Sequence, residues 1–277
     1  MDVNEFARAH PAMARIIAAA GLAVLAVSAA YAGDWLFALW IFLFIALTGL
    51  EWHGIAYGQV RTLTFALHLM GGALALAVTN LGHADVAYEI LGVTAVLAAA
   101  AARHARRDPL WAMIGTLYTV GPGVMLVWLR AVAQPGAMTL IWIFAVVWAT
   151  DMAALAVGRS VGGPKLSPRI SPKKTWAGLG GGIVGAAIVG AAVAVFVPGA
   201  NALAVASLSA VLAVIAQLGD LTESAFKRRF GVKDSGFLIP GQGGVLDRVD
   251  GLIFVAAAVA LLAWANDRAV LILGSTP

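Results

Sequence analysis

Two pairs of acidic residues interrupt long apolar stretches of this 277-residue chain. Asp220 and Glu223 are three residues apart near the end of one stretch, and Asp247 and Asp250 have the same spacing at the start of the next. Residues three apart lie on one face of a helix. Because an intramembrane carboxylate costs about 3 kcal/mol on insertion scales, such pairs indicate a functional site or strong polar partners.

Hydroxyl and basic side chains accompany these acids. Ser224 and Lys227 extend the helical face of Asp220, and the Pro- and Gly-rich connection 159–175 contains five basic residues in a segment that cannot form a regular helix. Carboxylates ligate Mg²⁺ through hard oxygens, while Lys and Arg neutralise phosphates. The combination predicts phosphate chemistry. For the charged helical face, the alternative is a purely structural network of ion pairs. For the connection 159–175, the alternative is that its basic residues set the membrane topology and bind anionic lipid.

Three further polar features lie near these groups or in other apolar stretches. The glycines of segment 241–244 directly precede the helix that carries Asp247, and they suit either an anion or an ordinary turn. Asp151 is expected roughly 10 Å inside the membrane end of its helix. Glu51 is expected to be a helix-end or packing residue rather than a catalyst.

The composition decides the class of protein that positions these groups. Apolar residues make up 61% of the chain and charged residues only 12%, with no cysteine. The mean hydropathy is +0.91. These values exclude a water-soluble enzyme, and the lack of cysteine excludes disulfides, thiolate nucleophiles and iron–sulfur clusters. We therefore expect an all-α, polytopic membrane protein with about nine transmembrane helices, at 12–32, 35–50, 62–80, 86–102, 109–132, 138–158, 176–198, 202–226 and 246–265.

The basic residues predict an orientation. With a cytoplasmic N-terminus, 16 of the 18 Lys and Arg residues lie on the inner side, and only Arg130 and Arg268 lie outside. This positive-inside bias predicts a C-terminus outside the cell membrane. The first apolar stretch, which ends at Ala30-Tyr31-Ala32, could instead be a cleavable signal.

Charge also divides the chain along its length. Half of the 32 charged residues lie within 151–250. We expect residues 1–135 to form a scaffold of transmembrane helices. Residues 136–277 are expected to form the catalytic region, with cytoplasmic loops at 159–175 and 227–245.

The segment 224–250, SAFKRRFGVKDSGFLIPGQGGVLDRVD, resembles the signature of the phosphatidate cytidylyltransferase (CDP-diacylglycerol synthase) family. In that family a serine and a basic pair precede KDSG, PGHGG and LDRxD. Segments 217–224 and 165–176 look like the family's other two blocks, whereas residues 1–150 share only the hydropathy profile. The resemblance implies transfer of CMP from CTP to phosphatidic acid, forming CDP-diacylglycerol and pyrophosphate at the cytoplasmic face of the inner membrane.

The resemblance also implies roles for individual residues. Mg²⁺, and optionally a second cation, would be held by Asp220, Asp247, Glu223 and Asp250. The expected catalytic residues are Asp220, Asp247, Lys227 and Arg248. The expected substrate-binding residues are Ser171, Lys173, Lys174, Thr175, Ser224, Arg228, Lys233, Asp234, Gly243 and Gly244, with Asp234 orienting Lys233. The expected partners are CTP, phosphatidic acid and the lipid bilayer, and no nucleic acid is expected. The sequence leaves the oligomeric state open, and a homodimer is one of the alternatives.

Two positions depart from the family pattern. Gln242 stands where the family usually has histidine, and Ala177 stands where it often has glutamate. Glutamine can hydrogen-bond a phosphate but cannot carry a proton or a positive charge near neutral pH. We expect that the histidine is not essential to the chemistry. The alternatives are a CTP-dependent lipid-alcohol kinase, another membrane cytidylyl transferase, a transporter and an inactive structural subunit.

Overall fold

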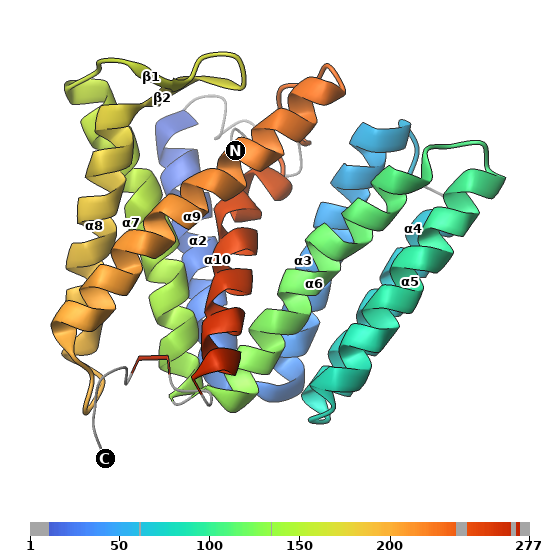
Figure 1. Ribbon diagram of the computed structural model, residues 1–277, viewed down its shortest axis with the longest axis horizontal. Helices are drawn as coiled ribbons and strands as arrows, with labels where there is room; N and C mark the ends of the chain where they lie inside the picture. The colour runs from blue at the N-terminus through green and yellow to red at the C-terminus, as the bar shows by residue number, and fades with distance from the viewer. Residues whose placement is uncertain (1–10, 61, 134, 237–242, 267–269, 272–277) are drawn as a thin grey trace. The chain divides into compact units, whose positions relative to one another are not determined.

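The computed structural model describes residues 11–60, 62–133, 135–236, 243–266 and 270–271. These residues form nine α-helices and one two-stranded hairpin. The helices are α2 (Pro11–Ala32), α3 (Asp34–Tyr57), α4 (Leu63–Asn80), α5 (Ala84–His104), α6 (Pro109–Val132), α7 (Gly136–Ser160), α8 (Trp176–Ala194), α9 (Ala202–Arg229) and α10 (Leu246–Ala265), and the strands are β1 (Lys165–Ser167) and β2 (Ser171–Thr175) (Figure 1).

The predicted polytopic helical architecture is confirmed. Within the described residues, the eight helices from α3 to α10 are long and apolar enough to cross a membrane. The first expected crossing corresponds to α2, in which the apolar stretch Ala20–Ala32 is shorter. The second crossing, expected at 35–50, corresponds to the longer helix α3, which continues to Tyr57 and ends at Gly58, whose φ of 65° suits glycine as a helix C-cap.

The chain divides into two compact units, each built from separate parts of the sequence. Residues 1–128 and 229–249 form the first unit, which contains α2 to α5, most of α6 and the first turn of α10. Residues 129–228 and 250–277 form the second unit, which contains α7, the hairpin, α8 and most of α9 and α10. The signature segment therefore contributes to both units.

Close helix packing in the first unit depends on small residues opposite large ones. A Cβ at Gly49 of α3 would lie 2.5 Å from Nε2 of His68 on α4. In the same unit, the indole of Trp52 donates a hydrogen bond to the carbonyl oxygen of Trp111 on α6, at 2.9 Å. Trp52 is buried together with its neighbours Glu51 and His53. Residues 51–53 of α3 are therefore enclosed by protein, whereas the last four residues of the helix are partly exposed.

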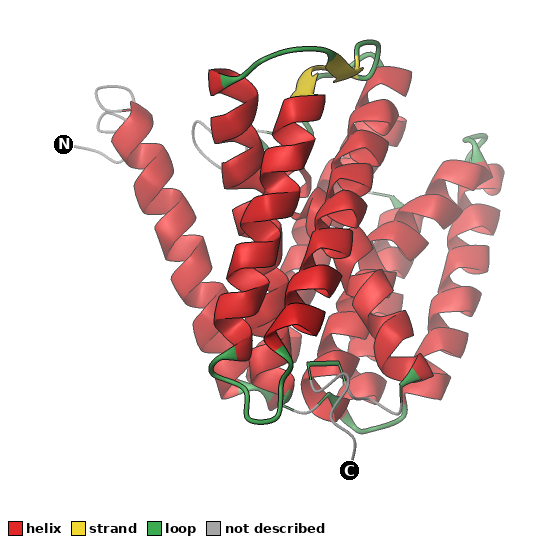
Figure 2. Ribbon diagram, turned by 60° about the vertical axis from the view of Figure 1, so that its left-hand side comes forward, coloured by secondary structure: helices red, strands yellow, loops and turns green. Residues whose placement is uncertain are grey.

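In the second unit, α7 and α8 pack through glycines of the stretch 178–185 (Figure 2). A Cβ at Gly181 would lie 2.5 Å from the Cβ of Val157, and one at Gly185 would lie 2.6 Å from the Cβ of Ala153. The stretch contains the pattern GxGxxG, which in a nucleotide-binding protein would form the turn between a strand and a helix, whereas here residues 180–185 lie inside α8. Here it allows two membrane helices to approach closely, as small residues at such spacing do.

Residues 159 and 160 of the expected connection 159–175 still belong to α7, and the rest of it is not helical, as expected, but forms an antiparallel hairpin that the all-α expectation did not include. Lys165 pairs with Thr175, and Ser167 pairs with Ser171. Pro172 lies within β2, which is possible because each strand of a two-stranded sheet has an edge without a ladder partner. Strand β2 leads directly into α8 and lies at one end of α7 and α8 (Figure 2).

Candidate active site

Asp220 on α9 is held by the hairpin within the second unit. The ammonium group of Lys174, on β2, lies 2.5 Å from Oδ2 of Asp220 and donates a hydrogen bond of 2.9 Å to Oε1 of Gln217. The hydroxyl of Ser224 donates to Oδ1 of Asp220 at 3.5 Å. The structure therefore brings a predicted phosphate-binding lysine to a predicted metal ligand, although they are 46 positions apart in the sequence.

One turn further along α9, Glu223 and Lys227 form a buried ion pair. Their Oε2 and Nζ atoms are 2.6 Å apart, and only 1% of the Glu223 side chain is exposed. Both charges of such a pair have lost hydration, so removal of either one would leave the other buried and uncompensated. This ion pair is part of the structural network that the sequence offered as an alternative, and both of its members belong to the expected site.

The first turns of α10 approach α9 through glycine. A Cβ at Gly219 would lie 2.5 Å from the carbonyl oxygen of Asp250, and one at Gly251 would lie 3.3 Å from the carbonyl oxygen of Ala216. This close approach brings the Asp250 carboxylate within electrostatic range of Asp220 and Glu223 on α9, and Asp151 of α7 also lies within that range. Oδ1 of Asp250 also accepts a hydrogen bond from the amide of Gly251, at 2.8 Å.

These four carboxylates fit a divalent cation by their chemistry. Carboxylate oxygens are the ligands that Mg²⁺ prefers, and acids held together repel one another unless a cation lies among them. Among the described residues, however, no three Asp, Glu, His or Cys side chains are grouped closely enough to hold a metal ion as they stand. Lys174 and Lys227 instead provide the positive charge next to Asp220 and Glu223.

Within the first unit, Asp247 is held by two short segments that precede it, residues 235–236 and 243–244. Its Oδ2 accepts hydrogen bonds from the amides of Ser235, at 3.1 Å, and Gly244, at 2.9 Å. The Asp247 amide in turn donates to Oγ of Ser235 at 3.3 Å. Gly243 has a φ of 88°, and a Cβ there would lie 2.7 Å from Oδ2 of Asp247. Ser235 and Gly244, which lie on either side of the residues outside the description, therefore both hold this carboxylate.

The structure adds a residue that the sequence did not assign to the site. Glu51 on α3 is 3% exposed, and its carboxylate accepts hydrogen bonds from the amides of Val245 and Leu246 at 2.8 and 2.7 Å. The hydroxyl of Ser235 also donates to it, at 3.1 Å. This burial agrees with the expectation that Glu51 is a packing residue. Glu51 is not at the end of its helix, however, because α3 continues for six more residues. An isolated acid in an apolar stretch was the available signal.

The remaining expected site residues differ in their surroundings. The side-chain oxygen of Thr175 accepts a hydrogen bond from the amide of Gly178 at 3.0 Å and thereby caps α8. Arg228 donates from Nε to the carbonyl oxygen of Ile170 in the hairpin turn, at 3.4 Å. Ser171 is half-buried on β2, Gln242 lies outside the described residues, and four side chains are exposed, those of Lys173, Lys233, Asp234 and Arg248.

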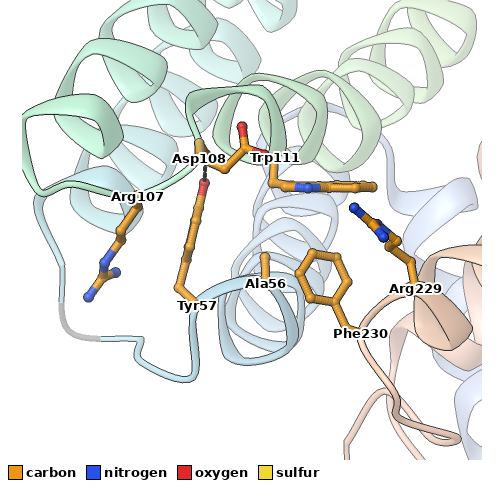
Figure 3. Close-up of a pocket in the computed structure, with 7 residues that line it drawn as sticks. All are labelled: Ala56, Tyr57, Arg107, Asp108, Trp111, Arg229 and Phe230. Atoms are coloured by element: carbon orange, nitrogen blue, oxygen red, sulfur yellow. Dashed lines mark hydrogen bonds between the residues drawn. The ribbon is translucent and has the colours of Figure 1, made fainter.

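A cavity of about 530 Å³ opens elsewhere in the first unit. None of the predicted site residues lines it, and its two arginines do not converge: the Arg229 guanidinium lies beside Trp111, whereas that of Arg107 lies on the far side of Tyr57 (Figure 3). Nη2 of Arg107 donates a hydrogen bond to Oε1 of Gln59 at 2.6 Å. The cavity is lined by Ala56, Tyr57, Arg107, Asp108, Trp111, Arg229 and Phe230.

Comparison with known families gives this geometry a context. The model of the cytidylyltransferase family matches residues 13–265, which is most of the chain. The chain belongs to the cytidylyltransferase family. The resemblance read from the three motif blocks is therefore confirmed, and the match to the cytidylyltransferase family model also includes helices that showed only an apolar profile.

Several named relatives are similar to this protein over about half of its chain. A protein of Brucella suis biovar 1 is 48% identical over 151 residues, which are 54% of this chain and 56% of the relative. One of Rickettsia bellii is 39% identical over 155 residues, covering 53% and 66%, and one of Staphylococcus haemolyticus is 40% identical over 161 residues, covering 58% and 61%. Each is named phosphatidate cytidylyltransferase. The chain thus matches about half the length of the first of these relatives.

Proposed function

We propose that this protein transfers CMP from CTP to phosphatidic acid and forms CDP-diacylglycerol and pyrophosphate. The observation that carries the proposal is the contact between Lys174 and Asp220, because it joins the basic hairpin to the acidic face of α9. A nucleotidyl transferase needs cations for the phosphates and carboxylates for a metal ion at one place. The names of the relatives supply the substrates.

In the proposed reaction, a phosphate oxygen of phosphatidic acid attacks the α-phosphorus of CTP. A new phosphorus–oxygen bond forms there, the bond to the β-phosphate oxygen breaks, and pyrophosphate leaves with the electron pair. No general base is required, because the attacking phosphate is already anionic near pH 7. Lysine and arginine side chains stabilise the charge that develops on the leaving group.

We assign the phosphate contacts to the cations of the hairpin and the signature segment. Lys174 and Lys227 are positioned next to carboxylates, and Lys173, Lys233 and Arg248 are exposed and able to reach a substrate. Arg228 would contribute from the end of α9, and Asp234 would orient Lys233. Ser171, Ser224 and the Gly243–Gly244 amides would complete the contacts to the substrates.

Asp220, Glu223 and Asp250 would hold Mg²⁺, and Asp247, one helical turn before Asp250, is a proposed ligand as well. When bound, Mg²⁺ would neutralise part of the negative charge on the phosphates that react. The protein's own contribution is to hold these carboxylates in one orientation. Gly219 would serve this purpose by letting α9 approach the backbone of Asp250. Ser235 would do so through its amide and its hydroxyl group, which both form hydrogen bonds with Asp247.

The proposal includes an orientation in the bacterial inner membrane. A cytoplasmic N-terminus and an external C-terminus would place 16 of 18 basic residues, and the hairpin, on the cytoplasmic side. The site would then face the compartment that supplies CTP. In this arrangement residues 136–277 carry most of the chemistry, and residues 1–135 act mainly as a scaffold.

Two labelled forms of CTP test the proposal with the purified full-length protein, phosphatidic acid and Mg²⁺. We expect the α-phosphate label to enter CDP-diacylglycerol and the γ-phosphate label to leave as pyrophosphate. EDTA, and the variants Asp220→Asn and Asp247→Asn, should abolish the transfer. Transfer of the γ-label to a long-chain isoprenoid alcohol would instead identify a lipid-alcohol kinase, and no transfer to any lipid would refute the proposal.

A further inference from the structure

We propose that Glu51 is a positioning residue for Asp247: it fixes the turn before α10 and thereby the orientation of the Asp247 carboxylate. The inference concerns the first unit alone, in which both residues lie. It deepens the proposed function and rests on it, because it assumes that Asp247 ligates a metal ion. Glu51 belongs to the helix region that the sequence marks only as scaffold.

The first step is the contact between Glu51 and the start of α10. Its two carboxylate oxygens each accept one of two consecutive backbone amides, Oε1 from Val245 and Oε2 from Leu246. The helix begins at Leu246, so these amides would otherwise have no partner within the helix. A carboxylate at this position receives charge-assisted hydrogen bonds and lies at the positive end of the helix dipole.

The second step is a chain of hydrogen bonds from Glu51 to Asp247 through Ser235. The Ser235 hydroxyl donates to Oε2 of Glu51 at 3.1 Å and accepts from the Asp247 amide at 3.3 Å. The Ser235 amide donates to Oδ2 of Asp247 at 3.1 Å. Movement of the Glu51 carboxylate would therefore release Ser235 and, with it, one of the donors that orient Asp247.

The third step is steric. A Cβ at Gly236 would lie 2.7 Å from Oε1 of Glu51, and a Cβ at Gly244 would lie 2.6 Å from each of its carboxylate oxygens. These two glycines come from the two separate parts of the signature segment. Both parts therefore close around the Glu51 carboxylate, which has room only because neither residue carries a side chain.

The test compares Glu51→Gln with Glu89→Gln, the same chemical change at an exposed position of α5. An amide presents only one acceptor oxygen, so at least one hydrogen bond from Val245, Leu246 or Ser235 is lost. We expect Glu51→Gln to raise the Mg²⁺ concentration for half-maximal activity about 10- to 100-fold, as loss of a partner that orients a metal ligand does. Glu89→Gln should leave it unchanged.

Two measurements do not depend on turnover. Binding of Mn²⁺, followed by electron paramagnetic resonance, should weaken by a similar factor in Glu51→Gln. Hydrogen–deuterium exchange should become faster in the peptide containing residues 243–247 and stay unchanged in α7 and α8. The milder variant Ser235→Ala, which keeps the two backbone bonds to Glu51, should change the same quantities less.

Unchanged Mn²⁺ affinity and unchanged exchange at 243–247 in Glu51→Gln would overturn the inference. Faster exchange throughout the protein with an unaltered Mg²⁺ midpoint would also overturn it, because Glu51 would then support the fold as a whole. If Glu51→Gln does not fold, Ser235→Ala decides by the same criteria. Failure of the wild-type protein to form CDP-diacylglycerol would refute the proposed function, whereas the exchange and Mn²⁺ data would still judge Glu51.

Discussion

At the scale of single residues, two close pairs of opposite charge lie at α9 in the described part of the second unit. Lys174 contacts Asp220, and Lys227 contacts the almost fully buried Glu223. Removal of one member of a buried pair leaves an uncompensated charge, which costs more than the intact pair contributes. These lysines therefore have two roles in the proposal, since they hold the carboxylates in place and are available to phosphates.

The pair on α9 gives a residue-scale prediction. Lys227→Met removes the charge but keeps most of the volume, so we expect it to lower the free energy of unfolding by about 3 kcal/mol. The double variant Glu223→Gln/Lys227→Met should recover most of this loss, because no buried charge is left alone. Thermal unfolding of the detergent-solubilised proteins measures both values. Equal losses in the single and double variants would contradict this account of the pair.

At the scale of elements, the position of the acids depends on how closely the helices approach one another. Gly219 allows α9 to contact the α10 backbone at Asp250, and Gly185 allows α8 to contact α7. The hairpin is tied to α9 by Lys174 and, through the carbonyl oxygen of Ile170, by Arg228. Small side chains at the helix contacts thus decide whether the carboxylates of different helices meet.

Gly219→Ala is the element-scale prediction. The added methyl would overlap the carbonyl oxygen of Asp250, so the two helices must separate locally. We expect a loss of about 1–3 kcal/mol in stability, as for other overpacked contacts, together with weaker Mg²⁺ activation. Gly180→Ala is the matched control, because a Cβ there meets no atom within 4 Å. Equal melting temperatures for the two variants would show that the α9–α10 contact tolerates a side chain.

At the scale of the whole molecule, eight described helices are long and apolar enough to span a membrane, and the chain has no cysteine. The proposed orientation places the two ends of α5 on opposite sides. Single cysteines can report this directly, because no native thiol competes. His83 and Ala105 flank α5, and both are exposed.

We expect His83→Cys to react with a membrane-impermeant maleimide in intact spheroplasts. Ala105→Cys should react only after the membrane is permeabilised, because the loop with Arg103, Arg106 and Arg107 is expected on the cytoplasmic side. Labelling is measured by the mass shift of the purified protein. The reverse pattern would invert the proposed orientation and place the hairpin outside the cytoplasm.

The sequence by itself determined the apolar stretches, the family and the segments that carry the acids, because hydropathy and motif spacing are local properties of the chain. It did not reveal that β1 and β2 pair, that Lys174 contacts Asp220, or that Glu51 contacts the start of α10.

Those three features depend on tertiary structure. Glu51 and Ser235 are 184 positions apart, and only the packing of α3 against residues 235–236 and 244–246 within the first unit makes them neighbours. Backbone amides at the start of a helix are present in every helix, so the sequence does not show which acid satisfies them. The motif indicates which residues belong to the candidate site, whereas the contacts between distant helices decide how those residues are oriented.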